Sequence, residues 1–253
     1  MRRTLIVGNW KMHKTVAEAR TMVRALLADP SWQHPDVDVA IAPAFTALPA
    51  VSELLAGNPK LCFGAQTMHW AEAGAYTGEI SAPMLVELGC TYALLGHSER
   101  RAHCGETDEG VNRKVKSALE HGLTPIVAVG ETLEQHEAGE AKLRVTSQIG
   151  AAFEGVSSAE RARCVVAYEP IWAIGSGLAE DPSSANEVMC VIRSFDAAFE
   201  GVQILYGGSV KPGNIAGFMA QPNVDGALVG GASLDPAGFA ELVRNARPQV
   251  AKA

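Results

Sequence analysis

The chain alternates between two hydrophobic patterns, and this alternation constrains its fold more than any other feature. Short apolar runs of strand length recur, and longer stretches with the 3.6-residue spacing of amphipathic helices lie between them. Strands that are apolar at nearly every residue and alternate with helices form parallel sheets covered on their faces. The predicted strands are Thr4–Val7, Val37–Ala42, Leu61–Ala65, Tyr92–Leu95, Pro125–Val129, Cys164–Ala167, Val202–Leu205 and Ala227–Val229.

Helix signals fit between these runs. Ser184 with Glu187 three residues later predicts a capping box at the start of one helix. Pro236 directly after Asp235 predicts a helix that begins with proline in its first turn. The clearest predicted helices are Val16–Ala28, Asp108–His121, Leu143–Phe153, Ser184–Phe199 and Ala237–Ala246.

Eight evenly spaced strands in 253 residues predict an α/β fold, a closed eight-stranded parallel (β/α)8 barrel. The length is close to the ~250 residues typical of that barrel. No linker or charge run divides the chain, so we expect residues 1–253 to form a single domain. The alternative is an open doubly wound sheet. Such a sheet usually carries a glycine fingerprint after its first strand, and the segment Gly8–Lys11 is not one.

Composition excludes several classes of function. The formal net charge of −7 gives no basic footprint for nucleic acid or an anionic membrane. No stretch approaches the roughly 20 apolar residues of a membrane helix, and the N-terminus lacks the apolar core of a signal peptide. The cysteines form no C-x-x-C pair, so we expect buried, reduced thiols and a cytoplasmic protein. They are Cys62, Cys90, Cys104, Cys164 and Cys190.

In a parallel barrel the carboxyl ends of the strands meet, so polar residues that follow an apolar run are candidate site residues. Asn9 and Lys11 follow the first run, and in extended chain this spacing puts both side chains on one face. A lysine directed into a barrel mouth is costly to desolvate unless it meets an anion. If each residue is considered alone, Lys11 is more commonly a solvated lysine and Asn9 a turn residue.

His97 follows the fourth run. Ser98 and Glu99 can begin a short helix behind it, which would place the imidazole near unpaired backbone N–H groups and favour its neutral form. A lone histidine at such a place is more often a hydrogen-bonded structural residue. We expect Arg100 and Arg101 to be surface or interface charges.

Glu169 follows the sixth run and precedes an apolar loop. A carboxylate between an apolar strand and a Pro-Ile-Trp segment faces partial desolvation, which increases its basicity. The loop Pro170–Gly177 has an apolar middle and ends in Gly-Ser-Gly, a composition typical of a hinged lid that excludes water. An ordinary loop with an ion-paired glutamate is the alternative.

Paired glycines follow the last two runs, at Gly207-Gly208 before Ser209 and at Gly230-Gly231. Such pairs allow backbone N–H groups to approach an anion, and phosphate sites of barrels lie in these two loops. Either pair alone could be a plain tight turn. No nucleotide-binding loop or metal-ligand cluster occurs, so we expect neither cofactor nor metal.

Several segments, in order along the chain from near Leu5 to near Val243, resemble the triosephosphate isomerase family. The run Tyr168–Gly175 is nearly diagnostic of that family. The other segments are Gly8–Met12, Gly64–Gln66, Tyr76–Ser81, Gly96–Arg101, Gly105–Thr107, Val129–Thr132, Tyr206–Val210 and Leu228–Ala232.

The resemblance implies an enzyme that interconverts D-glyceraldehyde 3-phosphate and dihydroxyacetone phosphate in glycolysis and gluconeogenesis, by proton abstraction through an enediolate. Members of this family are the standard example of a glutamate base beside a neutral histidine. By resemblance, Glu169 is the base, His97 the electrophile, and Lys11 and Asn9 the partners of the oxyanion. The implied phosphate-binding residues are Gly175, Ser209, Gly230 and Gly231, and the implied supporting residues are Glu99, Gln66 and Tyr206.

The resemblance also implies a homodimer in which the loop Ala73–Glu79 docks into the partner and Thr77 braces the partner's Asn9. The chain departs from the common family pattern at a few positions, most of them around the lid and the expected interface. They are Ala128, His103-Cys104, Ser176 and the segment Leu178–Asp181.

Three alternative functions remain open on the residues alone. Another phosphosugar isomerase or epimerase on a barrel would share the phosphate loops, although such epimerases generally need a metal site. An inactive sugar-phosphate-binding protein would be expected to lack Glu169, His97 or Lys11, and all three are present. A purely structural protein would not need an apolar lid.

Overall fold

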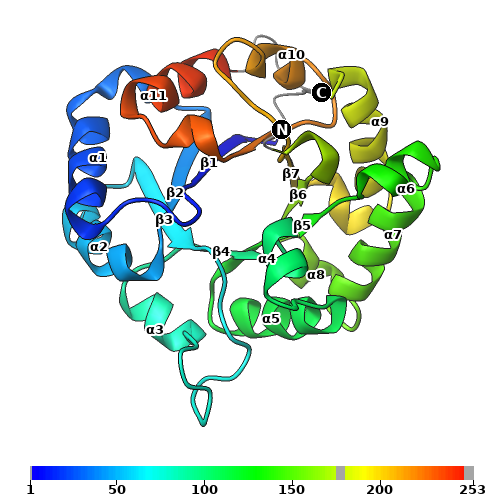
Figure 1. Cartoon of the computed structure of the whole chain (residues 1–253), viewed down its shortest axis with the longest axis horizontal. Coiled ribbons are helices and arrows are strands. Elements are labelled where there is room, and N and C mark those ends of the chain that lie inside the picture. Colours follow the sequence, from blue (N-terminus) through cyan, green and yellow to red (C-terminus); the bar gives the residue numbers. More distant parts are fainter. Residues whose placement is uncertain (1, 175–179, 248–253) are drawn as a thin grey trace.

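The computed structural model describes residues 2–174 and 180–247 and shows a closed barrel of eight parallel strands in chain order, with β8 paired to β1 (Figure 1). The predicted fold class is confirmed, and each predicted run forms a strand with ends within two residues of the expected ones. The strands are β1 (Thr4–Asn9), β2 (Val37–Ala42), β3 (Leu61–Ala65), β4 (Tyr92–Leu95), β5 (Thr124–Val129), β6 (Val165–Tyr168), β7 (Gln203–Tyr206) and β8 (Gly226–Val229).

Helices surround the barrel on its outside (Figure 1). The α-helices are α1 (Val16–Ala28), α2 (Leu48–Leu55), α3 (Ala82–Glu87), α4 (Ser98–His103), α5 (Asp108–Glu120), α6 (Leu133–Glu137), α7 (Ala141–Ala152), α8 (Ser158–Arg161), α9 (Pro182–Arg193), α10 (Ile215–Met219) and α11 (Pro236–Asn245). Short 3-10 helices are η1 (Pro30–Trp32), η2 (Phe45–Ala47), η3 (Ile171–Ala173), η4 (Ala197–Glu200) and η5 (Gly231–Ser233).

Helix α9 corrects one prediction about helix capping. Its N-cap is Asp181, whose carboxylate accepts hydrogen bonds from the amides of Ser183 and Ser184, so the predicted capping box of Ser184 with Glu187 is wrong. An aspartate followed by a proline at the first helical position caps the helix a turn earlier than the serine would. The helix also ends at Arg193, and the last part of the predicted range forms η4.

Helix α11 bears out the other capping prediction. Asp235 accepts a hydrogen bond from the amide of Gly238 at 2.7 Å, and Pro236 stands in the first turn.

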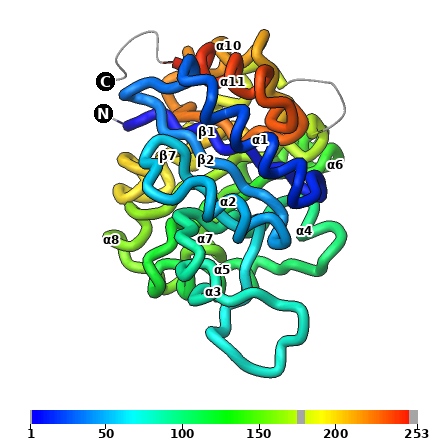
Figure 2. Tube along the Cα trace, turned by 90° about the vertical axis from the view of Figure 1, so that its left-hand side faces the viewer, coloured from blue at the N-terminus to red at the C-terminus, as the bar shows by residue number. Residues whose placement is uncertain are grey.

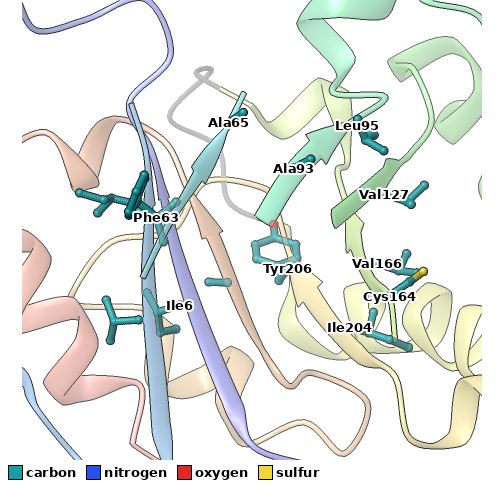
Figure 3. Packing of buried hydrophobic residues seen from close by; sticks show 14 of the residues in the cluster. Ile6, Phe63, Ala65, Ala93, Leu95, Val127, Cys164, Val166, Ile204 and Tyr206 are labelled. Carbon is teal, nitrogen blue, oxygen red and sulfur yellow. The ribbon is translucent and has the colours of Figure 1, made fainter. Parts of the chain in front are cut away.

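The core has two layers because alternate residues of each strand point to opposite faces. Residues such as Leu5, Val7 and Leu205 form a cluster that fills the barrel interior. The intervening residues pack outward against the helices, and Figure 3 shows this outer layer on successive strands, with Ile6 and Phe63 among them. The filled interior leaves the carboxyl ends of the strands as the place where a site can form.

The loop between β3 and α3 projects from the body of the barrel (Figure 2). Within the described ranges, no helix is both long enough and apolar enough to cross a bilayer.

All five cysteines are free thiols. The expectation that they are buried is confirmed for Cys90 and Cys164 and is wrong for the others, of which Cys62 is partly exposed. Cys104 and Cys190 are exposed, because Cys104 caps the carboxyl end of α4 and Cys190 lies on an outward face of α9.

Candidate active site

A pocket of about 560 Å³ opens at the carboxyl ends of the strands. It brings together seven of the predicted site residues, from five separate strand ends. Its lining consists of Asn9, Lys11, His97, Glu169, Ile174, Gly207, Gly208, Ser209, Val210, Lys211, Leu228, Gly230, Gly231 and Ala232.

Glu169 directly follows β6 and lies in the wall of this pocket with 2% of its surface exposed. Its Oε2 accepts a hydrogen bond of 2.9 Å from the backbone amide of Ser98. Its Oε1 lies 3.1 Å from Nε2 of His97, but the two groups are not aligned as a hydrogen bond, and Oε1 has no hydrogen-bond partner among the described residues. The carboxylate is thus held by one oxygen while the other remains available to take a proton.

The position of Glu169 depends on close approach of the backbone. Its amide donates to the carbonyl of Val129 at 2.8 Å, and a Cβ on Gly130 would lie 1.8 Å from the carbonyl oxygen of Glu169. A side chain at Gly130 would therefore displace the backbone of Glu169 at this end of β6.

His97 is the N-cap of α4, as the sequence predicted. Gly96 turns the chain out of β4 with a φ of +75°, a conformation that favours glycine. The Nδ1 atom of His97 accepts a hydrogen bond of 3.2 Å from the amide of Glu99. A ring nitrogen that accepts from an amide carries no proton, so the proton of the neutral imidazole lies on Nε2, which faces Glu169.

Arg101 differs from its prediction as a surface or interface charge. Its side chain is only 14% exposed and pairs with Asp108. Its Nε donates to the carbonyl of Gly96 at 2.7 Å, so Arg101 fixes the turn that carries His97. Arg100 is more exposed, at 29%, and lies 3.2 Å from Glu106.

Lys11 reaches the pocket by a different route from the one expected. Strand β1 ends at Asn9, and Lys11 has a φ of +51°, so the two residues do not share a face of extended chain. Instead, Oδ1 of Asn9 accepts from the amide of Lys11 at 3.0 Å, and the side-chain amide of Gln66 donates to the carbonyl of Lys11 at 2.8 Å. These bonds hold the turn that directs the ammonium group into the pocket.

The ammonium group of Lys11 lies 2.5 Å from Oε1 of Glu99. Partial burial would raise the pKa of Glu99, but the hydrogen bond and charge of Lys11 outweigh it and lower the pKa. Glu99 therefore stays ionised at neutral pH and balances the charge of Lys11.

The opposite side of the pocket consists of the two glycine-rich loops. Ser209 donates its hydroxyl to the carbonyl of Ala173 at 2.5 Å, which joins the loop after β7 to η3. Gly230 precedes η5 and packs against Lys11, since a Cβ there would lie 3.2 Å from Cε of that lysine.

Gly175, the remaining predicted phosphate-binding residue, lies outside the described residues. Tyr206 is fully buried, and its hydroxyl would lie 2.3 Å from a Cβ on Gly208.

Lys211 also lines the pocket, although we did not predict it. It stands two residues beyond Ser209 in the loop after β7, so a cation next to the predicted phosphate loop was the signal in the sequence. It adds positive charge to the side where the paired glycines lie.

The described part of the predicted lid, Pro170–Ile174, contains η3 and contributes Ile174 to the pocket. The indole nitrogen of Trp172 donates to Oε1 of Glu131 at 2.8 Å, and the hydroxyl of Tyr168 donates to the same oxygen at 3.1 Å. Glu131 is completely buried. The sequence showed Glu131 only as part of a family segment, with nothing to indicate that it holds Trp172.

Gly207→Ala tests whether the position of the Glu169 carboxylate matters. A Cβ at Gly207 would lie 2.8 Å from Cγ of Glu169 and 3.1 Å from the carbonyl of Tyr168. Because displacing a reacting group by about 1 Å can cost about 100-fold, we expect kcat to fall by one to two orders of magnitude. The control is Gly213→Ala in the same loop, where a Cβ meets nothing within 4 Å. Equal kcat values for the two variants in steady-state assays would contradict the packing argument.

A model of the family described as triosephosphate isomerase matches residues 4–246. A protein of Chloroflexus aurantiacus named triosephosphate isomerase is 51% identical over 249 residues, which is 96% of this chain and 99% of that protein. Proteins of the same name from Caldanaerobacter subterraneus and Symbiobacterium thermophilum are 50% and 48% identical, again over 96% of this chain and over 99% and 96% of their own lengths. The chain belongs to the triosephosphate isomerase family.

Proposed function

We propose that this chain interconverts D-glyceraldehyde 3-phosphate and dihydroxyacetone phosphate, with Glu169 as the base. Membership of the family supports this reaction. The observation that carries the assignment of the site is Oε1 of Glu169, which has no hydrogen-bond partner among the described residues and is buried in the same pocket as the N–H of His97 and the ammonium group of Lys11. A buried carboxylate beside a hydrogen-bond donor and a cation is suited to removing a proton next to a carbonyl.

In this mechanism Oε1 of Glu169 takes a proton from the carbon next to the carbonyl, and the electron pair of that C–H bond forms the double bond of an enediolate. Negative charge develops on the former carbonyl oxygen. Lys11 as a fixed cation and Nε2–H of His97 as a donor stabilise this charge. His97 moves a proton between the two oxygens, and Glu169 returns its proton to the other carbon, so no atom is gained or lost.

The phosphate of the substrate would lie against the loops after β7 and β8, where Ser209, Gly230 and Gly231 line the pocket. Backbone N–H groups that precede short helices attract anions. Binding of the phosphate away from the reacting carbons can supply the energy that holds substrate and loops in place. Exclusion of water by the apolar Ile171–Ile174 segment would protect the enediolate from losing its phosphate.

The test of the function is a coupled spectrophotometric assay of glyceraldehyde 3-phosphate conversion to dihydroxyacetone phosphate in the presence of EDTA. We expect turnover that EDTA does not reduce, because all the groups in the mechanism are side chains and backbone of this chain. No turnover by a folded sample would remove the assignment, and loss of turnover on adding EDTA would favour a metal-dependent isomerase or epimerase.

We also propose that residues 1–253 form one domain, that the protein is a cytoplasmic homodimer, and that it takes neither nucleic acid nor membrane as a partner. Free thiols are compatible with a reducing compartment. The projecting loop supports the dimer, since Tyr76 in it and Met84 and Val86 in α3 are exposed by 47%, 50% and 44%. Beside the loop lies a groove of about 480 Å³, lined by Thr77, Tyr76, Arg113 and their neighbours.

Thr77→Arg tests the dimer. Thr77 is exposed on the projecting loop, and a bulky charge there would prevent docking into a second copy. We expect light scattering to show twice the chain mass for the unmodified protein and a monomer with reduced activity for the variant. Leu143→Arg, at a residue 71% exposed on α7, is the control and should remain dimeric. A monomeric unmodified protein would contradict the proposal.

A further inference from the structure

Glu180 is a buried carboxyl group that the proposed mechanism does not use. It directly precedes Asp181, the N-cap of α9, and is 4% exposed. Neither of its carboxylate oxygens forms a hydrogen bond with a described residue. An ionised carboxylate buried without partners is strongly unfavourable, so this side chain requires an explanation.

The surroundings of Glu180 contain a second buried acid. Glu131 interacts electrostatically with Glu180, is completely buried, and has one oxygen without a partner in the described part of the chain. Burial raises the pKa of both groups, and for Glu180 the charge of Glu131 acts in the same direction and brings the pKa to about 7. Glu131 in turn lies 3.6 Å from Nδ1 of His136.

The other groups facing Glu180 come from three elements. Tyr168 at the end of β6 and Tyr206 at the end of β7 interact with it, as do Asp181 and Ser184 at the start of α9. The hydroxyls of Tyr168 and Ser184 are close enough to lower its pKa, although neither makes a hydrogen bond of ordinary geometry with it. None of these groups carries a positive charge, and the two hydroxyls do not offset the effects of burial and of Glu131 on the pKa of Glu180.

We propose that Glu180 is a positioning residue that carries a proton and, through the hydroxyl of Tyr168 and through Glu131, keeps Trp172 and the Pro170–Ile174 segment in place beside the pocket. The hydroxyl of Tyr168 has one proton, which it donates to Glu131. A protonated Glu180 can donate to the free lone pairs of that hydroxyl oxygen. An ionised Glu180 competes with Glu131 for the hydroxyl proton and repels Glu131, the acceptor that holds the indole of Trp172.

The expected pH dependence follows from the direction of the shift. The pKa of Glu180 in the folded protein is about 7, against 4.5 for an unperturbed glutamate. The unfolded chain therefore loses this proton first as pH rises. The contribution to stability is complete below 4.5, declines between 4.5 and about 7, and stays reduced above that range.

The experiment uses the full chain labelled with 5-fluorotryptophan, with the Trp172 resonance assigned by Trp172→Phe. In 19F NMR spectra from about pH 5.5 to about pH 8.5, we expect the Trp172 resonance to titrate with a midpoint near 7. The titration should vanish in Glu180→Gln, which keeps the shape and the hydrogen-bonding capacity of a protonated glutamate. It should persist in Glu187→Gln, a control at an exposed glutamate on α9 that pairs with Lys142.

His136 needs its own control, because its ring packs on that of Trp172 with centroids 4.4 Å apart. The titration should survive in His136→Gln. A titration that persists in Glu180→Gln, or one absent from the unmodified protein, would overturn the proposal.

Two further readouts do not depend on the fluorine signal. Infrared difference spectra between about pH 6 and about pH 8 should show the carbonyl stretch of a protonated carboxylic acid in the unmodified protein but not in Glu180→Gln. Absence of that band from the unmodified protein would overturn the proposal. Glu180→Gln should also unfold at a higher temperature than the unmodified protein at about pH 8 and at an equal temperature at about pH 4. A lower unfolding temperature at about pH 8 would also overturn it.

The kinetic consequence rests on the proposed function. Between about pH 6 and about pH 8, KM of the unmodified protein should rise about threefold more than KM of Glu180→Gln. This factor corresponds to a coupling of about half a pKa unit between the ionisation of Glu180 and the binding of substrate. Titration of the substrate phosphate affects both proteins equally and cancels in the comparison. Equal pH profiles of KM would contradict the positioning role, whereas failure of the proposed function would appear as inactivity with the spectroscopic results unchanged.

Discussion

We expect Glu169→Asp to lower kcat by about 100-fold or more while KM stays close to that of the unmodified protein. Aspartate retains a carboxylate but withdraws it by one methylene. In the structure Oε1 of Glu169 lies 3.1 Å from His97 and faces the pocket, while Oε2 is fixed by the amide of Ser98 at 2.9 Å. The shorter side chain cannot keep the Ser98 bond and still reach the substrate carbon. The phosphate loops are untouched, so binding should change little.

The measurement is steady-state kinetics in both directions, with circular dichroism to show that the variant is folded. Glu187→Asp shortens an exposed glutamate on α9 by the same methylene and should leave kcat unchanged. Glu169→Gln, which removes the base, should lose about 10²–10⁴-fold, the range that general bases contribute. Unchanged turnover in Glu169→Asp would mean that Glu169 is not the base.

Lys11→Ala should lower kcat/KM by about 10²–10³-fold or more, because it removes the cation on which the developing negative charge depends. The fold should survive. The partner of Lys11 is Glu99, whose side chain is 45% exposed, and the loss of an ion pair with a partner so accessible to water costs little stability. Alanine at residue 11 must also adopt a φ of +51°, but lysine already tolerates this conformation without the freedom of glycine.

Lys142→Ala is the matched control, since it removes a lysine that pairs with the exposed Glu187, and neither residue lines the pocket. It should keep full activity and the same unfolding temperature. A Lys11→Ala protein that turns over substrate as efficiently as the unmodified one would rule out the proposed role of this cation in stabilising the oxyanion.

The barrel itself was predictable from the sequence. The pattern of each strand is local, because a strand buried on both faces must be apolar at nearly every residue. The predicted ranges Val37–Ala42, Leu61–Ala65 and Tyr92–Leu95 match β2, β3 and β4 at both ends. Helix α1 also agrees at both ends, since Thr15 and Glu18 form a capping box within four residues. The start of α9 was predicted wrongly, because Asp181 caps the helix a turn before Ser184.

The polar residues at the strand ends were also visible in the sequence, and the structure brings Asn9, Lys11, His97 and Glu169 to one pocket. What only the tertiary structure decided is how they are held. Lys11 enters through a left-handed turn fixed by Gln66, a residue 55 positions away, rather than along an extended strand.

The contacts of Arg101 and of the pair Glu131 and Glu180 were also decided only by the tertiary structure. In the sequence Arg101 is one of two adjacent arginines, and only the fold shows that it holds the carbonyl of Gly96. Nothing in the local sequence marks Glu180 as buried, and only the fold places it where it interacts with Glu131, a residue distant in the chain. Burial pattern and helix capping depend on neighbours in the chain and can be read from it. The partners of a buried charge are chosen by the packing of distant segments, which no local pattern encodes.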